Sequence, residues 1–249
     1  MNHSKKLKCA APDLQVEVGP EKKVYEYVGV VLAARCAYVD SLLATPMKEQ
    51  QTRRLTFPEI YPKVWDKMMR FLEEGGSDMT FEDAVEVIPF YEKYRFEGGI
   101  NIVDTFLARQ VSDKDMLDRM KHFIVSKRNG AIAPLSHHPM AWFIPRMQLS
   151  HTYNLEKASE VCIESLEGIL QDEEARIVIW VRHWMDLAPI VVEDRRLWGP
   201  ISEVLLKVGE SNTDNFVAGS RQGGSTMIFK LLRALYEREY AEKKGVRFP

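Results

Sequence analysis

The sequence predicts an α+β fold, in which a small sheet near the start of the chain is followed by helices. Residues 14–18 (LQVEV) alternate apolar and polar side chains, and extended character resumes in KVYEYVGV after a GPEK turn. This pattern indicates a β-hairpin with one buried face. A short third strand is expected from Arg54 to Phe57. Apolar residues then recur at helical spacing, and strands followed by helices are typical of α+β domains.

The first expected helix spans residues 30–43 (VVLAARCAYVDSLL). Steps of three and four residues place four apolar side chains on one face of this helix. They are Leu32, Cys36, Val39 and Leu43. Because an amphipathic helix buries such a face, Leu32 is expected in the core of the first half.

Three further helices are expected before residue 112, separated by proline and glycine. PKVWDKMMRFLEEGG begins with Pro62 and is stopped by its two terminal glycines. FEDAVEVIPFYEKY follows, and Pro89 is expected to end or kink it. The Gly98-Gly99 pair is expected to break the chain before the amphipathic helix INIVDTFLARQV.

The rest of the chain is expected to contain helices without strands. Residues 111–152 include three prolines, a His-His pair and scattered aromatics, and are expected to form an irregular connection. This connection would join a domain at residues 13–110 to a helical region at residues 153–249. In that region a helical stripe is formed by Leu155, Ala158, Cys162, Leu166 and Ile169, and helical spacing returns in ISEVLLKV and MIFKLLRALYEREYAEKK.

The composition narrows the classes of function. With 34 basic and 36 acidic residues, the chain gives no electrostatic reason to expect nucleic acid as a partner. Its three cysteines lie too far apart for a disulfide framework or a metal pair, which fits a reducing compartment. The sequence has neither the apolar core of a secretory signal nor an uncharged apolar stretch of about 20 residues. A cytoplasmic or nuclear protein that is not in a membrane is therefore expected.

No catalytic, metal or cofactor site is expected, so the chain is predicted not to be an enzyme. Residues 219–226 (GSRQGGST) have the glycine spacing of a phosphate loop, but Ser225 stands where the loop needs lysine. Ser225 or Thr226 as a helix N-cap explains this segment better. The histidines have no partners at metal spacing. Cys36 and Cys162 fall on apolar helical faces, which predicts buried thiols, although the sequence leaves open a Cys–His pair assembled in space.

Strings of the first half resemble the BTB/POZ family in order and spacing. They are PDLQVEVGPEKKVYEYVGVVLAARCAYVDSLL, MKEQQTRRLTFPEIYPKVWDKMMRFLEEG and YEKYRFEGGINIVDTFLA. The family's V-L-A-A-R-S-x-Y-F helix is matched by residues 31–39, with Cys36 for the serine and Val39 for the phenylalanine. This resemblance implies a BTB/POZ fold, a three-stranded sheet packed on a helical cluster, used for protein–protein interaction. The second half resembles the helical BACK-like extension of many BTB proteins only by position and helical character.

The resemblance also implies contact residues for a partner. BTB adaptors for cullin-type ubiquitin ligases often carry an apolar-any-glutamate triplet before the third strand, which here is Met47-Lys48-Glu49. Met47 would fill a groove on the cullin, and the carboxylate of Glu49 would make a polar contact beside it. Tyr91 and Tyr94 lie on the helix that lines the same surface in such adaptors, but aromatic residues near a helix end are more often core.

Two hypotheses of function follow from the resemblance. In the leading one, the chain is a substrate adaptor whose first half holds a cullin and whose second half holds an unknown target protein. In the alternative, it is a BTB scaffold that associates with itself or with other proteins and recruits no ligase.

The resemblance bears on self-association through Asp13, which matches the family's acidic residue before the first strand. In dimeric relatives this residue pairs with a basic residue that falls here at Gly29, and an amphipathic helix precedes the first strand. The twelve residues before Asp13 form no apolar stripe. We therefore expect Asp13 to lack this partner and residues 1–110 to be monomeric or only weakly associated.

Overall fold

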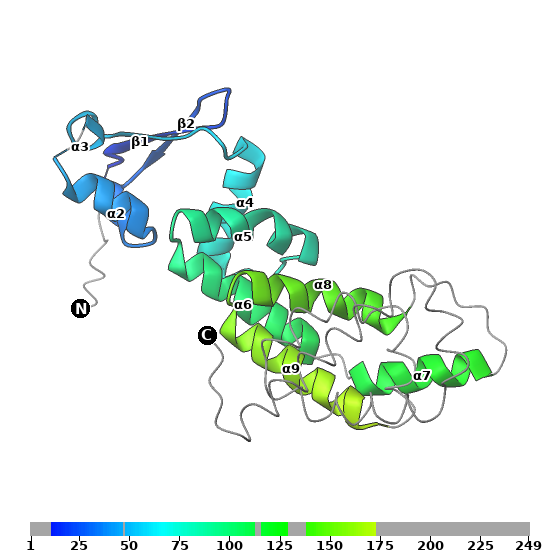
Figure 1. The fold of residues 1–249 in the computed structure, drawn as a ribbon. Helices are drawn as coiled ribbons and strands as arrows, with labels where there is room; N and C mark the ends of the chain where they lie inside the picture. The colour runs from blue at the N-terminus through cyan, green and yellow to red at the C-terminus, as the bar shows by residue number, and fades with distance from the viewer. Residues whose placement is uncertain (1–10, 47, 113–115, 129–137, 173–249) are drawn as a thin grey trace, which may run out of the picture. The chain divides into compact units, whose positions relative to one another are not determined.

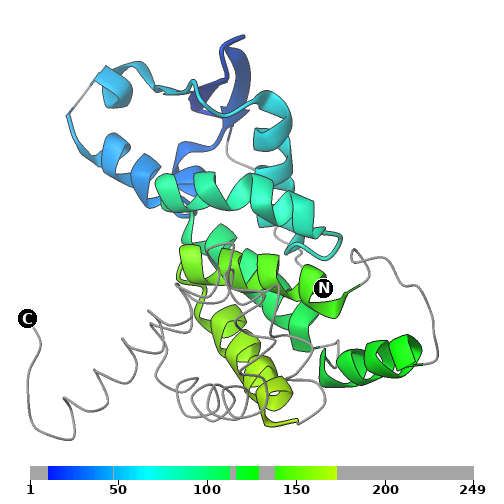
Figure 2. The same ribbon diagram turned by 45° about the vertical axis from the view of Figure 1, so that its right-hand side comes forward.

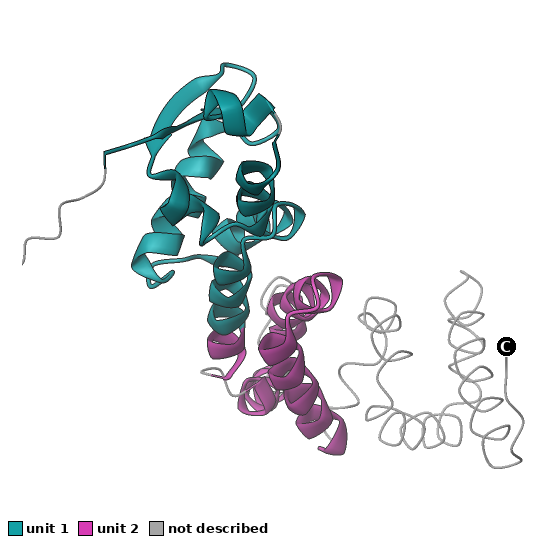
Figure 3. Cartoon of the chain, turned by 90° about the vertical axis from the view of Figure 1, so that its left-hand side faces the viewer, with its two compact units in different colours: residues 1–107 teal, residues 108–249 magenta. Residues whose placement is uncertain are grey.

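The computed structural model describes residues 11–46, 48–112, 116–128 and 138–172. The chain divides into two compact units, residues 1–107 and 108–249 (Figure 3). Unit 1 contains β1 (Leu14–Val18), β2 (Lys23–Tyr27), α1 (Gly29–Ala33), α2 (Ala37–Ala44), α3 (Lys48–Thr52), β3 (Arg54–Phe57), α4 (Pro62–Glu74), α5 (Phe81–Lys93) and the start of α6 (Glu97–Ser112) (Figure 1). The predicted α+β class is confirmed.

The sheet has the order β2-β1-β3, with β1 antiparallel to β2 and parallel to β3. Side chains alternate between the two faces of a strand, so the apolar positions of β1 all lie on one face. Val16 of β1 is buried and pairs with Tyr25 of β2 and with Leu55 of β3, which is also buried. The hairpin and the third strand are therefore both confirmed, and this face of the sheet forms the core of unit 1.

The single helix expected over residues 30–43 is wrong, because the structure has two helices, α1 and α2, in its place. Cys36 interrupts the helix with an extended backbone (φ −140°). The interruption is held by the turn between α5 and α6, where Arg95 O accepts from the Ala37 N–H at 3.2 Å and Tyr94 O accepts from Cys36 Sγ at 3.1 Å. The predicted apolar side chains still face the core on both sides of the break. Leu32, Cys36 and Val39 are buried, and Leu43 is half-buried.

Helix α4 has the predicted ends. Pro62 occupies its first turn, where a missing N–H costs nothing, and Gly75 closes it with a left-handed backbone at φ +74°. Helix α5 begins at the N-cap Thr80 and continues through Pro89 to Lys93, so the proline does not end it. Buried side chains on both sides of Pro89, including Ile88 and Tyr91, anchor α5 in the core and compensate for the lost hydrogen bond.

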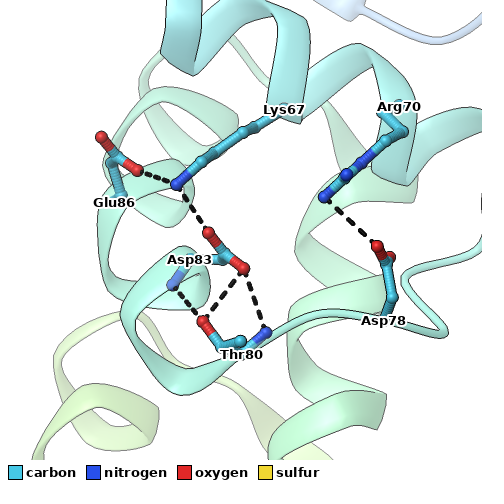
Figure 4. Close-up of polar contacts among 6 residues, drawn as sticks. All are labelled: Lys67, Arg70, Asp78, Thr80, Asp83 and Glu86. Carbon is cyan, nitrogen blue, oxygen red and sulfur yellow. Dashed lines mark hydrogen bonds and ion pairs between the residues drawn. The ribbon is translucent and has the colours of Figure 1, made fainter.

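Polar contacts join α4 to the start of α5 (Figure 4). Lys67 Nζ lies 2.6 Å from Asp83 Oδ1 and 2.5 Å from Glu86 Oε2. Asp83 also forms a capping box with Thr80, whose hydroxyl accepts from the Asp83 N–H at 3.1 Å. Burial raises the pKa of Asp83, but hydrogen bonds from Lys67 and Thr80 outweigh it and leave the pKa below its ordinary value. The stabilisation from these bonds is therefore present above the unfolded pKa of Asp83 and is lost as the pH falls through the folded one.

The break expected at Gly98-Gly99 is wrong, because α6 begins at Glu97 and both glycines lie in its first turn. The reason for a glycine is clear at position 99. A Cβ built on Gly99 would lie 2.5 Å from ring carbons of Tyr91, whereas a Cβ on Gly98 would meet only Leu72 Cδ2, at 3.7 Å. Gly99 thus lets the backbone of α6 approach the buried ring of Tyr91 closely.

This difference predicts opposite effects for two neighbouring substitutions. Gly99→Ala is expected to lower the free energy of unfolding by about 1–3 kcal/mol, because the methyl group overpacks against Tyr91. Gly98→Ala, the matched control, is expected to be neutral or to stabilise by up to about 1 kcal/mol, since alanine is favoured over glycine in a helix. Urea unfolding of both variants measures the difference. Equal stabilities would contradict the close approach of α6 to Tyr91.

The described part of unit 2 contains helices α7 (Met116–Arg128), α8 (Pro139–Thr152) and α9 (Glu156–Gln171), and α8 and α9 lie side by side (Figures 1 and 2). The expectation of an irregular connection is therefore wrong for residues 116–128 and 139–152, which are helical. Pro139 does not oppose a helix, because it lies in the first turn of α8, and His138 Nδ1 caps that turn by accepting from the Met140 N–H at 3.1 Å.

The predicted apolar stripe of α9 is confirmed, since all five of its side chains are buried: Leu155, Ala158, Cys162, Leu166 and Ile169. In the described part of the chain, no strand follows residue 112. The helices expected beyond residue 172 and the loop at residues 219–226 lie outside the described residues.

Candidate partner-binding surface

The segment between α2 and β3 is exposed and carries the predicted contact residue Glu49. Helix α3 buries none of its residues, and Glu49 is half-buried in its first turn. Among the described residues Glu49 forms no ion pair, so its carboxylate is available to a partner. Met47 lies outside the described residues.

Tyr91 and Tyr94 are core residues. Tyr91 is fully buried, and its hydroxyl donates to Met68 O at 2.7 Å, which satisfies the one polar group that burial would otherwise leave unpaired. Burial raises the pKa of this hydroxyl above its ordinary range. Tyr94 is also buried, with its ring 4.8 Å from that of Phe57, and burial raises its pKa to about 12. Neither side chain offers an exposed ring to a partner.

An exposed aromatic residue that the sequence reasoning missed is Tyr38 of α2. It is 38% exposed, and its ring packs edge-to-face on Tyr94 at 5.3 Å and on Phe57 at 6.1 Å. The ion pair between Glu59 and Lys93 lies beside this cluster, with Lys93 Nζ 5.5 Å from the Tyr94 ring centre. Tyr38 directly precedes the buried Val39, so the helical pattern marked it as an outward position. The aromatic ring exposed here is therefore that of Tyr38.

Asp13 has a partner within its own chain, which corrects the expectation that it lacks one. One of its oxygens lies 3.2 Å from Arg53 Nη2, and the other accepts from the Gly29 N–H at 2.6 Å. The missing basic side chain at position 29 is thus replaced by a backbone donor and by an arginine distant in sequence. Asp13 ties the start of β1 to α1 and β3 and does not depend on a second copy of the chain.

Comparison with known proteins identifies the first half. A family model described as the BTB/POZ domain matches residues 3–111, which include every described strand and helices α1 to α5. No curated protein matches the chain. Among the described helices, none is long and apolar enough to cross a membrane.

Proposed function

We propose that the protein is a substrate adaptor for a cullin-type ubiquitin ligase. The proposal starts from the BTB/POZ domain in residues 3–111, which makes this chain a protein–protein interaction module. The BTB/POZ domain holds the cullin, and the helical second half holds a target protein. On this proposal the protein is not an enzyme itself, and it works in the cytoplasm or the nucleus.

The observation that supports this proposal most is the position of Glu49 on α3, between α2 and β3, where it is half-buried and forms no ion pair among the described residues. The triplet Met47-Lys48-Glu49 falls where cullin adaptors of this family often carry their apolar-any-glutamate contact. Helix α3 buries none of its residues, so packing in the core does not account for Lys48 or Glu49. Exposed Tyr38, on the preceding helix, extends the same segment with an aromatic side chain, a residue type enriched at interfaces.

Substitutions in the triplet test the proposal. Met47→Ala is expected to weaken cullin binding by more than about 1 kcal/mol, a factor of about five in Kd, because interface energy is concentrated in a few enclosed anchors. Glu49→Lys is expected to weaken cullin binding at least as much, since it reverses a charge at close range. The measurement is titration calorimetry of the full chain against a cullin N-terminal domain.

Gln50→Ala is the matched control, because Gln50 is exposed on the same short helix but lies outside the triplet. It is expected to leave binding unchanged. All three variants are expected to keep the melting temperature of the wild type, because α3 buries none of its residues and the sequence predicts that Met47 lies on a surface loop. If the wild type does not bind the cullin, the adaptor function is wrong. If binding survives both triplet substitutions, the contact lies elsewhere on the domain.

A second candidate function, self-association as a scaffold, is favoured by one observation. On α1, Val30 is 73% exposed and Val31 is 49% exposed, so two adjacent apolar side chains face solvent. Adjacent exposed apolar side chains are more typical of a helix face that contacts another protein than of one that contacts only water. A ligase-free scaffold would use this face and would have no need of Met47 or Glu49.

The two candidates differ in the oligomeric state that they require. We expect residues 1–110 to be monomeric or only weakly associated, because Asp13 is already paired with Arg53 in its own chain. Any stable dimer of the full chain then depends on the second half. Light scattering of the fragment and of the full chain over a range of concentrations measures this. A tight dimer of the fragment would support the scaffold and contradict the expectation.

A further inference from the structure

A cavity of about 220 Å³ opens on unit 1 between β2, α1 and α4. Most of its wall is apolar, and the residues that form this part are Pro12, Tyr27, Val28, Val31, Leu32 and Met69. Pockets that enclose a small-molecule ligand usually measure about 300–1,000 Å³. This cavity is smaller, so it suits a single long side chain from another protein.

Two carboxylates line the cavity beside this apolar wall. Glu26 comes from β2 and Glu73 from α4, and both residues are exposed. Within the ranges that the structure describes, neither glutamate forms an ion pair. Arg35 is half-buried and adds a positive charge to the lining, so two negative charges stand against one positive charge. The cavity therefore favours a cation.

The carboxylate of Glu73 acts on the aromatic part of the wall. Burial raises the pKa of the Tyr27 hydroxyl to about 12, and the negative charge of Glu73 adds to this rise. A carboxylate close to an aromatic ring suits a guanidinium group, which stacks on rings and pairs with carboxylates through two parallel N–H donors. The ammonium group of lysine is a more strongly hydrated point charge and gains less from such a wall.

We propose that this cavity binds an arginine side chain of a partner protein. The methylene stem of the arginine packs on Val31 and Met69, and its guanidinium group pairs with Glu26 and Glu73. The division of the lining into an apolar wall and a pair of carboxylates matches the two parts of an arginine side chain. A neutral or acidic side chain would leave both carboxylates without a partner.

The exposed face of α1 defines the residue next to this arginine. Val31 lines the cavity and is 49% exposed, and the neighbouring Val30 is 73% exposed. An apolar residue beside the arginine covers these two valines, so the segment that fits is an arginine with apolar neighbours. The inference does not depend on the adaptor function, because Lys48 and Glu49 do not line the cavity.

The binding of two synthetic peptides to the full chain tests the proposal. Both peptides have the sequence Gly-Ser-Leu-X-Leu-Ser-Gly, with a neutral dye at the N-terminus and an amide at the C-terminus. X is arginine in one peptide and citrulline, which has nearly the same shape but no charge, in the other. Fluorescence anisotropy at low salt is expected to show at least about tenfold tighter binding of the arginine peptide. Because the glutamates are exposed, added salt is expected to reduce this preference.

A double substitution identifies the carboxylates responsible. Glu26→Gln combined with Glu73→Gln is expected to bring the affinities for the two peptides to within about twofold of each other, because the charge that distinguishes them is gone. The matched control is Glu74→Gln, since Glu74 is exposed on the same helix but does not line the cavity. It is expected to keep the preference for arginine. Melting curves check that the variants are folded, and exposed positions without ion pairs are expected to leave them unchanged.

Three results would overturn the proposal. The first is equal binding of the two peptides by the wild type, or no binding of either. The second is a preference for arginine that persists after both carboxylates are removed. The third is a dimer of the full chain that the double substitution dissociates in light scattering, because the occupant of the cavity would then be a second copy of the chain.

Discussion

Trp65→Ala is expected to lower the free energy of unfolding by about 3–5 kcal/mol, the cost typical of removing a buried aromatic side chain. Trp65 of α4 is fully buried at the centre of unit 1. Its ring lies 4.9 Å from that of Phe57 and 6.3 Å from that of Phe96, which joins α4 to the sheet and to the start of α6. Its Nε1 also donates to the Tyr27 hydroxyl at 2.8 Å, so the substitution removes packing and a hydrogen bond together.

The control for this substitution is Tyr61→Ala. Tyr61 is the N-cap residue of the same helix and a large aromatic, but it is 65% exposed. Its replacement is expected to change stability by no more than about 0.5 kcal/mol. Urea unfolding followed by far-ultraviolet circular dichroism measures both variants. Similar losses for Trp65 and Tyr61 would contradict the placement of the core on this face of α4.

Leu32→Ala is expected to cost about 2–5 kcal/mol, the range for a fully enclosed leucine. Leu32 lies on the buried face of α1 and also lines a cavity between β2, α1 and α4. Removing its side chain therefore enlarges a space that already exists beside it. The loss is expected in the middle or upper part of the range for this reason.

Val30→Ala is the matched control for Leu32→Ala, because Val30 lies on the same short helix and is mostly exposed. Its replacement is expected to leave the melting temperature almost unchanged, since little apolar surface is buried there. A thermal scan of the two variants beside the wild type gives the comparison. A melting temperature unaffected by Leu32→Ala would show that the buried face of α1 is a different one.

Local sequence patterns were sufficient to predict the strands of the sheet and the two ends of α4. Alternation in residues 14–18 places one set of side chains on one face whatever the tertiary context, and Gly75 ends α4 because its left-handed backbone costs glycine little. The predicted faces of α2 and α9 were correct for the same reason. Resemblance to the BTB/POZ family added the position of Glu49, which periodicity alone does not distinguish from a solvated loop.

Other features depended on residues far apart in the sequence. The break at Cys36 is stabilised by carbonyl groups of residues 94 and 95, and no helical pattern near Cys36 contains that information. Gly99 resembles a helix breaker in the sequence, but in the fold it provides space for the ring of Tyr91. Similarly, Asp13 finds Arg53 only because β1 and β3 are neighbours. The sequence by itself thus determined the elements whose signals are local. Contacts between distant segments decided where helices break, and they decided that Tyr91 and Tyr94 are buried while Tyr38 stays partly exposed beside them.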